Sequence, residues 1–282
     1  MKAEQRFLRL PQDFWANVKA ISEHVGYTAR SSGQVKIPSP EEIALASRQM
    51  GLDASVLCIN NDKLTPAGSQ LSEYFAYRAA VLNNFVQSRL MDVGRARKGF
   101  HDLKRRLSPQ CPLPMNKQKG DKKSFAFLTG CVNMLIEKNK GNHSCDYNPQ
   151  SLVKIVQSGR LLRTLSRRVD GAFPGITNPV AVWEIKEYYY TTTFGSRVAD
   201  GIYESLLDGM GLDEAGRNTN LRVRHYLIID RKYTWWDCGR SYLCRLIDML
   251  HMGYVDEVLF GYEAIERLPE LVQEWCAAAD AL

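Results

Sequence analysis

The run of residues 180–190 constrains the fold of this chain more than any other feature of its sequence. It reads VAVWEIKEYYY, follows an Asn-Pro pair and is rich in β-branched and aromatic residues, which together predict a strand. Because side chains alternate along a strand, we expect Val182, Glu184 and Lys186 to lie on one face and Trp183 on the other. The glutamate and the lysine therefore project together at the end of an apolar strip.

A third charged residue, Asp170, lies fourteen residues before Glu184 and is followed by a glycine. An Asp-Gly pair at the end of a short strand directs the carboxylate towards the next strand. Two carboxylates and a lysine on a sheet suit metal-assisted phosphodiester hydrolysis, because the carboxylates bind a divalent cation and the lysine steadies the attacking water. The alternative is an ion pair on an edge strand. An acidic residue two positions before a lysine occurs four times, but only Glu184 and Lys186 lie in a strand-like run.

Asp170, Glu184 and Lys186 resemble the PD-(D/E)xK motif of the restriction-endonuclease-like phosphodiesterases, with Val169 at the position of the nominal proline. The predicted order of elements agrees with this family. A helix over 151–165 precedes the strand that carries Asp170, and the strand over 180–190 follows. A helix from about residue 194 to 207 and a buried strand over 223–230 complete the order. The resemblance covers roughly residues 145–260.

This resemblance implies an α/β fold whose core is a restriction-endonuclease-like mixed sheet flanked by helices. It also implies that Asp170 and Glu184 bind one or two Mg²⁺ ions, for which Mn²⁺ can substitute, with the Ile185 carbonyl as a further ligand. Lys186 would position the water or help to deprotonate it. On the helix after the strand, Arg197 is a candidate phosphate ligand and Glu204 a further acidic partner, although helix-surface ion pairing also explains both.

The expected activity is that of a Mg²⁺-dependent endodeoxyribonuclease with a type II-like restriction or defence role. Cleavage of double-stranded DNA in that role predicts a homodimer, since each site cuts one strand. One alternative is a recombination, repair or transposition nuclease of the same fold. The other is a DNA-binding protein without catalytic activity, in which the motif is structural. RNA is not excluded as a substrate.

The net charge is +6, and basic residues are concentrated in one segment. Residues 89–140 contain thirteen Lys or Arg and four Asp or Glu. This composition is typical of a surface that binds phosphates, and the alternative is a solvated linker. The candidate DNA-binding residues are Lys104, Arg105, Arg106, Arg168 and Arg197.

The N-terminal part predicts a mainly helical region. Helices are expected from Pro40 to Gly51, with Ser39 as N-cap, and from Ser69 to Leu90. With a short strand-like run at 55–59 between them, they resemble a winged-helix module, which often reads DNA. Packing against the nuclease and a dimer interface are the alternatives. We therefore expect an N-terminal domain over 1–106, a basic connector over 107–144 and a nuclease domain over 145–282.

Several classes of protein are disfavoured by the composition. No apolar run approaches the length of a membrane span, and the first residues lack the apolar stretch of a signal peptide. The seven cysteines form no Cys-x-x-Cys pair, and the five histidines are dispersed. These patterns argue against a disulfide framework and a zinc site and predict a cytoplasmic, reduced protein.

Overall fold

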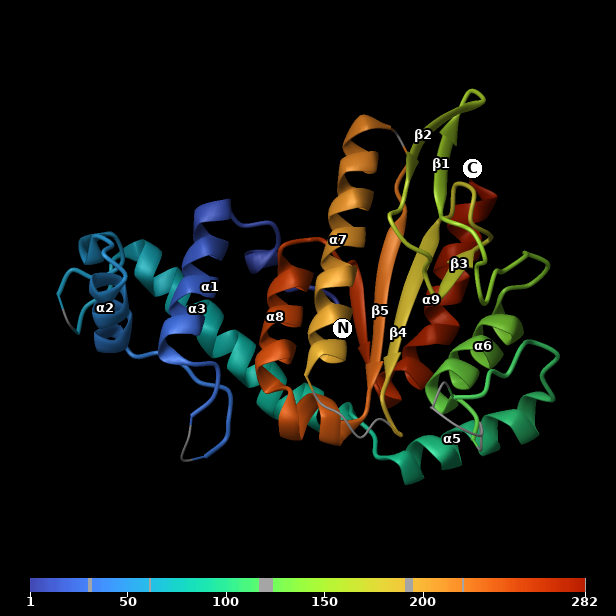
Figure 1. Cartoon of the computed structure of the whole chain (residues 1–282), viewed down its shortest axis with the longest axis horizontal. Coiled ribbons are helices and arrows are strands. Elements are labelled where there is room, and N and C mark those ends of the chain that lie inside the picture. Colours follow the sequence, from blue (N-terminus) through green and yellow to red (C-terminus); the bar gives the residue numbers. More distant parts are fainter. Residues whose placement is uncertain (30–31, 61, 117–123, 191–194, 220, 282) are drawn as a thin grey trace.

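A four-stranded mixed sheet lies at the centre of the computed structural model (Figure 1). The structure describes residues 1–282 except 30–31, 61, 117–123, 191–194, 220 and 282, and except the side chains of 196, 197 and 218. The strands, in sheet order, are β3 (Gly171–Phe173), β4 (Ala181–Glu187), β5 (Arg224–Asp230) and β6 (Glu257–Phe260). β3 is antiparallel to β4, whereas β4, β5 and β6 are parallel. The predicted mixed α/β architecture is thus confirmed.

Helices cover both faces of this sheet, as an open sheet with parallel strands requires. On one face lie the two crossover helices, α7 (Ser196–Asn218) between β4 and β5 and α8 (Arg240–His251) between β5 and β6. On the other face lie α6 (Phe127–Asn139) and α9 (Tyr262–Asp280), and α5 (Val93–Leu107) packs against α6. Figure 1 shows α5 and α6 on the side of the molecule away from α8.

The predicted alternation along β4 is confirmed. Trp183 stacks on Trp275 of α9 with ring centroids 5.4 Å apart, while Val182 packs against the C-terminal half of α7. The neighbouring β3 strand passes so close to this indole that a Cβ on Gly171 would lie 2.0 Å from the Trp183 ring. The glycine after Asp170 is therefore required by packing, and it allows Asp170 to lie directly beside β4.

Residues 151–165 form a β-hairpin, so the helix predicted there was wrong. Its strands are β1 (Lys154–Gln157) and β2 (Arg160–Thr164), which pair antiparallel. Ser158 and Gly159 at the turn have φ angles of 49° and 75°, and two successive positive φ values favour a tight hairpin. The apolar residues of the segment are compatible with either a helix or strands, and the Ser-Gly pair was the signal that distinguished the two.

The N-terminal region is helical, as predicted, but the strand expected at 55–59 was wrong. Its helices are α1 (Gln12–Val25), α2 (Pro40–Gln49), which begins with the predicted Ser39 cap, and α3 (Pro66–Ala80). A 3₁₀ turn, Ala54–Val56, occupies the expected strand. Within the described part of residues 1–90, β-pairing is limited to isolated bridges, so the hairpin wing of a winged helix is lacking there. α3 continues through a π-helical segment, Val81–Val86, into α4 (Gln87–Arg89).

The segment expected as a basic connector, 107–144, contains α6, which is mostly buried in the central core. The segment was predicted to be a connector from its overall charge, although it contains the apolar run FLTGCVNMLI, which forms most of α6. The lysine-rich residues 117–123 lie outside the described residues.

A buried ion pair connects the N-terminal helices to the sheet. Arg78 of α3 donates to both carboxylate oxygens of Asp248 on α8, at 3.0 and 2.9 Å. Tyr74 donates to the same carboxylate at 2.6 Å, and Arg78 also donates to Ser22. The first residues extend the sheet, because Lys2 forms an antiparallel bridge with Glu257 at the edge of β6. Among the described helices, none is both long and apolar enough to span a membrane.

Candidate active site

The structure brings the three motif residues together. The Asp170 carboxylate accepts a hydrogen bond from the Ile185 amide at 2.8 Å, and the Asp170 amide donates to Glu184 Oε1 at 3.1 Å. Lys186 Nζ lies 2.9 Å from Glu184 Oε2 on the same face of β4. The two hydrogen bonds from backbone amides to carboxylates hold Asp170 next to Glu184, although the two residues are fourteen positions apart in the sequence.

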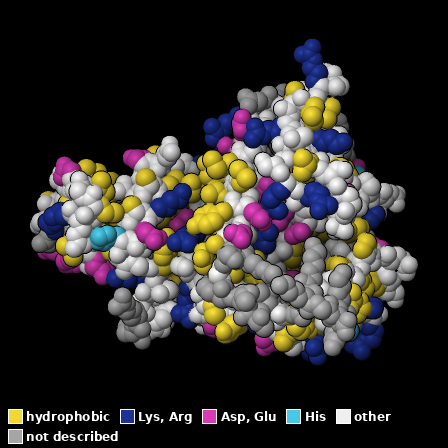
Figure 2. Space-filling view, viewed as in Figure 1, with side chains coloured by type: hydrophobic (Ala, Val, Ile, Leu, Met, Phe, Trp, Pro, Cys, Tyr) yellow, Lys and Arg dark blue, Asp and Glu magenta, His cyan; other side chains and the backbone are white. Residues whose placement is uncertain are grey.

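Three further charged residues complete this group, which we call the charged cluster. Arg167 Nη2 lies 2.8 Å from Glu184 Oε2 and 2.9 Å from Asp208 Oδ2 of α7. Glu204, one turn earlier on α7, lies 3.3 Å from Lys186 Nζ and 3.8 Å from Arg167 Nη1. The charged cluster consists of Arg167, Asp170, Glu184, Lys186, Glu204 and Asp208. Figure 2 shows acidic and basic side chains intermixed between α7 and the adjacent strands.

Sequence reasoning found four members of the charged cluster and missed Asp208 and the role of Arg167. Glu204 and Asp208 are four residues apart on α7, so a helical wheel places them on one face. That spacing was the signal for Asp208. Nothing in the sequence distinguished Arg167 from Arg168, which lies beside it but binds Gln150 at 3.2 Å instead.

The electrostatics of the charged cluster are dominated by burial and close opposite charges. Glu184 is 1% exposed; burial would raise its pKa, but Lys186 and Arg167 outweigh burial and hold the pKa below its usual value. The same contacts raise the pKa of Lys186 and of Arg167 against the effect of burial. Both cations and Glu184 therefore stay charged at neutral pH.

Asp208 differs from Glu184 because its pKa is raised and not lowered. It is also 1% exposed, and burial raises its pKa to about 6, although Arg167 opposes the rise. Neither of its carboxylate oxygens has a hydrogen-bond partner within the described structure, because the nearby Arg167 nitrogen is not aligned for one. A buried carboxylate without a hydrogen bond is unfavourable, and a metal ion bound directly by its oxygens would relieve this cost.

The charged cluster fits a divalent cation in charge and donor type. Four carboxylates face two cationic side chains, so two negative charges are left over when all four are ionised. Carboxylate oxygens are also the ligands that Mg²⁺ prefers. In the described residues, however, no group of three or more His, Cys, Asp or Glu is gathered in a metal-binding arrangement. Arg167 and Lys186 lie between the carboxylates, and a cation would bind by displacing one of them.

Glu187 faces the opposite side of the sheet, as expected from its position after Lys186. It accepts hydrogen bonds from the amide and hydroxyl of Thr129 at the start of α6, at 2.7 and 3.1 Å. Burial raises the pKa of Glu187 to about 7. Asp230, its register partner on β5, is also buried, and burial raises its pKa to about 7. These two acids belong to the core and not to the charged cluster.

The candidate DNA-binding residues are not gathered in one place. Lys104, Arg105 and Arg106 are exposed on the last turn of α5, which packs on the α6 side of the sheet, away from the charged cluster. Arg105 pairs with Asp102 at 2.7 Å, and Lys104 lies over the Phe125 ring. The side chain of Arg197 lies outside the described residues.

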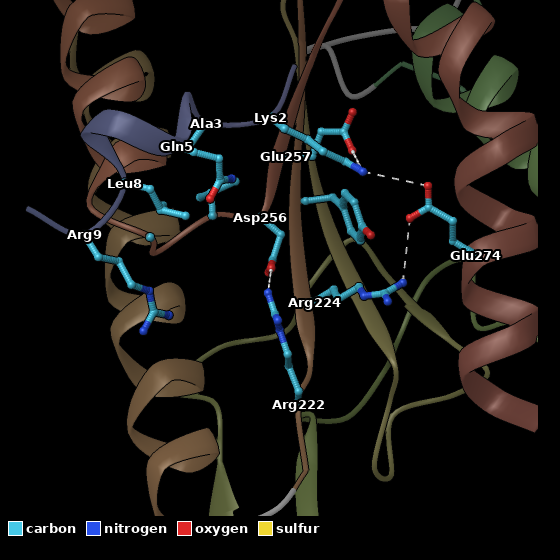
Figure 3. A pocket seen from close by; sticks show the side chains of 13 residues that line it. Lys2, Ala3, Gln5, Leu8, Arg9, Arg222, Arg224, Asp256, Glu257 and Glu274 are labelled. Carbon is cyan, nitrogen blue, oxygen red and sulfur yellow. Dashed lines mark hydrogen bonds and ion pairs between the residues drawn. The ribbon is translucent and has the colours of Figure 1, made fainter. Parts of the chain in front are cut away.

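A concavity with a volume of about 290 Å³ lies apart from the charged cluster, at the amino ends of β5 and β6 (Figure 3). Three of its basic residues pair with acidic residues of its lining: Arg222 contacts Asp256 at 2.8 Å, and both Arg224 and Lys2 lie 3.9 Å from Glu274. The fourth, Arg9, pairs with Asp213 outside the lining. Because its basic residues are already paired with acidic residues, we assign no ligand to this concavity.

Two family models match the chain, and both describe domains of unknown function. The first, DUF7687, matches residues 91–275, which is more than half of the chain. The chain belongs to this family. The second, DUF7690, matches residues 1–85. No curated protein and no solved structure matches the chain.

All six residues of the charged cluster lie within the DUF7687 match. The two matches divide the chain between residues 85 and 91, before the boundary expected at residue 106. This division places α5 with the segment that carries the sheet, in agreement with its packing on α6.

Proposed function

We propose that the chain is a metal-dependent nuclease that hydrolyses phosphodiester bonds of double-stranded DNA. The observation that carries the proposal is that Asp170, Glu184 and Lys186 lie together. The Asp170 amide donates to the Glu184 carboxylate, the Ile185 amide donates to the Asp170 carboxylate, and Lys186 forms an ion pair with Glu184. The mixed sheet, in which an antiparallel β3–β4 pair is followed by a helix and a parallel β5, also supports a restriction-endonuclease-like core. A restriction or defence role as a homodimer is the form of this activity that we favour.

Asp170 and Glu184 would hold Mg²⁺, with the Ile185 carbonyl as a further ligand. The bound cation would offset negative charge on the scissile phosphate and lower the pKa of a bound water. Lys186 keeps its proton beside Glu184 and would orient the water and stabilise charge as the phosphorus–oxygen bond breaks. Arg167 neutralises Glu184 and Asp208 in the free protein, and it is suited to contact a phosphate when a cation takes its place.

The test is digestion of plasmid DNA with Mg²⁺, with EDTA, and by the variant Glu184→Gln. Loss of a metal ligand removes several kcal/mol of transition-state stabilisation, so we expect cleavage by Glu184→Gln to fall by about a hundredfold or more. Binding of DNA in Ca²⁺ should remain. Wild-type cleavage that persists in excess EDTA would contradict the proposal.

Glu187→Gln is the matched control. It changes a second glutamate of the same strand, partly buried, which faces Thr129 across the sheet from the charged cluster. We expect it to keep near wild-type cleavage, so that any loss in Glu184→Gln reports the site and not a disturbed β4.

A structural role for the same residues is the second candidate. It is favoured by the ion pairs of Arg167 and Lys186 with Glu184, which already neutralise the buried carboxylate. In that case wild-type protein binds DNA without cutting it in Mg²⁺ or Mn²⁺, and Glu184→Gln changes only stability.

A further inference from the structure

The β1–β2 hairpin has a fixed base and an exposed end. Its base is buried through Ile155 and Leu165, which pack with the C-terminal half of α7. Asn178 holds the base through two hydrogen bonds to the backbone of Val156, at 2.7 and 2.8 Å. At the other end, Leu161 and Leu162 are 62% and 44% exposed. Figure 1 shows the hairpin projecting beyond the sheet and past the end of α7.

The hairpin and the residues that flank it in the sequence carry charge of one sign. Residues 147–169 contain no Asp or Glu and five basic residues: Lys154, Arg160, Arg163, Arg167 and Arg168. Arg163 pairs with Glu214 of α7 and Arg167 belongs to the charged cluster. Within the described residues, Lys154 and Arg160 have no carboxylate partner among the ion pairs. Basic side chains thus extend from the exposed end of the hairpin to the carboxylates of the site (Figure 2).

This combination indicates a polyanion as the partner. Two exposed leucines alone would suit a protein interface, but a second copy of the same hairpin would bring like charges together. A two-stranded β-ribbon has the width that the major groove of B-DNA admits, and apolar side chains contact thymine methyl groups there. Basic residues on the same ribbon would meet the phosphates on either side of the groove.

The pairing of the hairpin shifts register between Ile155 and Val156 and leaves Leu162 without a partner on β1, so a bulge there relaxes the strict alternation of Leu161 and Leu162. We propose that the β1–β2 hairpin enters the major groove of duplex DNA, with Leu161 and Leu162 against the base edges and Arg160 on the backbone. This inference rests on the proposed function and deepens it, because it names the element that positions the duplex over the charged cluster. The contact is rigid, since the base of the hairpin is anchored in the core and Arg167 follows it directly into the site.

The experiment measures binding of a short duplex by Glu184→Gln protein in Ca²⁺, so that the DNA is not cut. Replacing both leucines by serine should weaken binding about tenfold, as expected for the loss of direct base contacts. Arg160→Gln should lower the slope of log K against log salt by about 0.9, the value for one phosphate contact. Dimethyl sulfate footprinting should show guanine N7, a major-groove atom, protected by the parent and exposed with the serine variant.

Leu52→Ser and Lys63→Gln are the matched controls, since both residues are exposed in the N-terminal region. They should bind as the parent does. Serine variants that bind as tightly as the parent, or that alter the sedimenting mass instead of DNA affinity, would overturn the hairpin inference while cleavage by wild-type protein stands. Failure of wild-type protein both to bind and to cut duplex DNA would overturn the proposed function itself.

Discussion

The buried carboxyl group of Asp230 makes the stability of the folded protein depend on pH. It lies at the end of β5, accepts hydrogen bonds from the Met91 and Arg231 amides at 2.7 Å each, and accepts one from the Tyr189 hydroxyl. Burial raises the pKa of Asp230 to about 7, and these hydrogen bonds only partly oppose the rise. The folded state therefore holds a proton that the unfolded chain, with a carboxyl pKa of about 4, has already released.

The consequence is a loss of stability as pH rises. Between about pH 4 and pH 7 the folded protein binds more protons at this site than the unfolded chain, so the free energy of unfolding falls across that window. We expect Asp230 alone to lower the Tm of the wild type by roughly 5 °C from pH 5 to pH 8, and the raised pKa values of Glu187 and Asp208 to add to this drop. Asp230→Asn should reduce this drop and be the more stable protein at pH 8. A Tm profile that is equally steep in the variant would contradict the assignment.

For individual residues, part of the charged cluster was predictable from the sequence. The alternation rule correctly placed Glu184 with Lys186 and put Glu187 on the other face, because a strand leaves only two directions for a side chain. Asp208 and Arg167 come from segments whose distance to β4 depends on how α7 and the hairpin pack. The spacing of Glu204 and Asp208 predicts that they share one face of α7, but no local pattern specifies how α7 and the hairpin pack on β4. The contacts of Asp208 and Arg167 within the site were therefore not predictable from the sequence.

Among the secondary-structure elements, α7 is the one whose placement decides the geometry of the charged cluster. Gly209, next to Asp208, lies against the chain that leads from α8 to β6, and a Cβ there would be 2.2 Å from the Tyr254 carbonyl oxygen. Gly209→Ala should therefore displace α7, cost about 1–3 kcal/mol and reduce cleavage, because Glu204 and Asp208 move with the helix. Thermal unfolding and a plasmid digest measure the two effects.

Gly216→Ala provides the comparison in the same helix. The nearest atom to its added Cβ is 3.8 Å away, so alanine should stabilise the protein by about 0.5–1 kcal/mol through its higher helix propensity. Equal effects of the two substitutions would show that close packing of α7 does not limit the site.

The exposed basic residues of α5 allow a test of whether this helix binds DNA. Lys104, Arg105 and Arg106 are exposed on its last turn. If they contact phosphates, replacing all three by glutamine should weaken binding to every duplex alike and reduce the salt slope by roughly 3. The matched triple variant Lys19→Gln, Arg48→Gln and Lys63→Gln lies in the N-terminal helical region and should leave the slope unchanged. An unaltered slope in the α5 variant would identify α5 as a solvated surface.

Elements with one dominant signal were predictable. The strands β4 and β5 and the capped helix α2 follow from β-branched runs and from Ser39, and the structure contains all three. Residues 151–165 carried competing signals, since their apolar positions fit a helix as well as a hairpin. The turn at Ser158 and Gly159 decides in favour of the hairpin, because successive positive φ angles end any helix.

In the molecule as a whole, the buried pair of Arg78 and Asp248 holds the N-terminal helices on the sheet. Removing one partner leaves an unpaired buried charge, so Arg78→Met should destabilise the protein by about 3–5 kcal/mol. The double variant Arg78→Met with Asp248→Leu should recover most of that loss, because both charges are then absent. Urea unfolding of the two single variants and the double variant tests this coupling. Additive effects would contradict it.

The same pair has a consequence for how relatives of this chain diverge. Arg78 lies in the DUF7690 match and Asp248 in the DUF7687 match, so each segment supplies the counter-charge that the other needs. A chimera that combined these segments from two different proteins would be destabilised by an unpaired buried charge unless both parents used the same pair or neither did. Exchange of one segment between relatives, with a crossover at residues 85–91, is therefore disfavoured, although only a few residues connect the two matches. We expect the two segments to be inherited together as a unit.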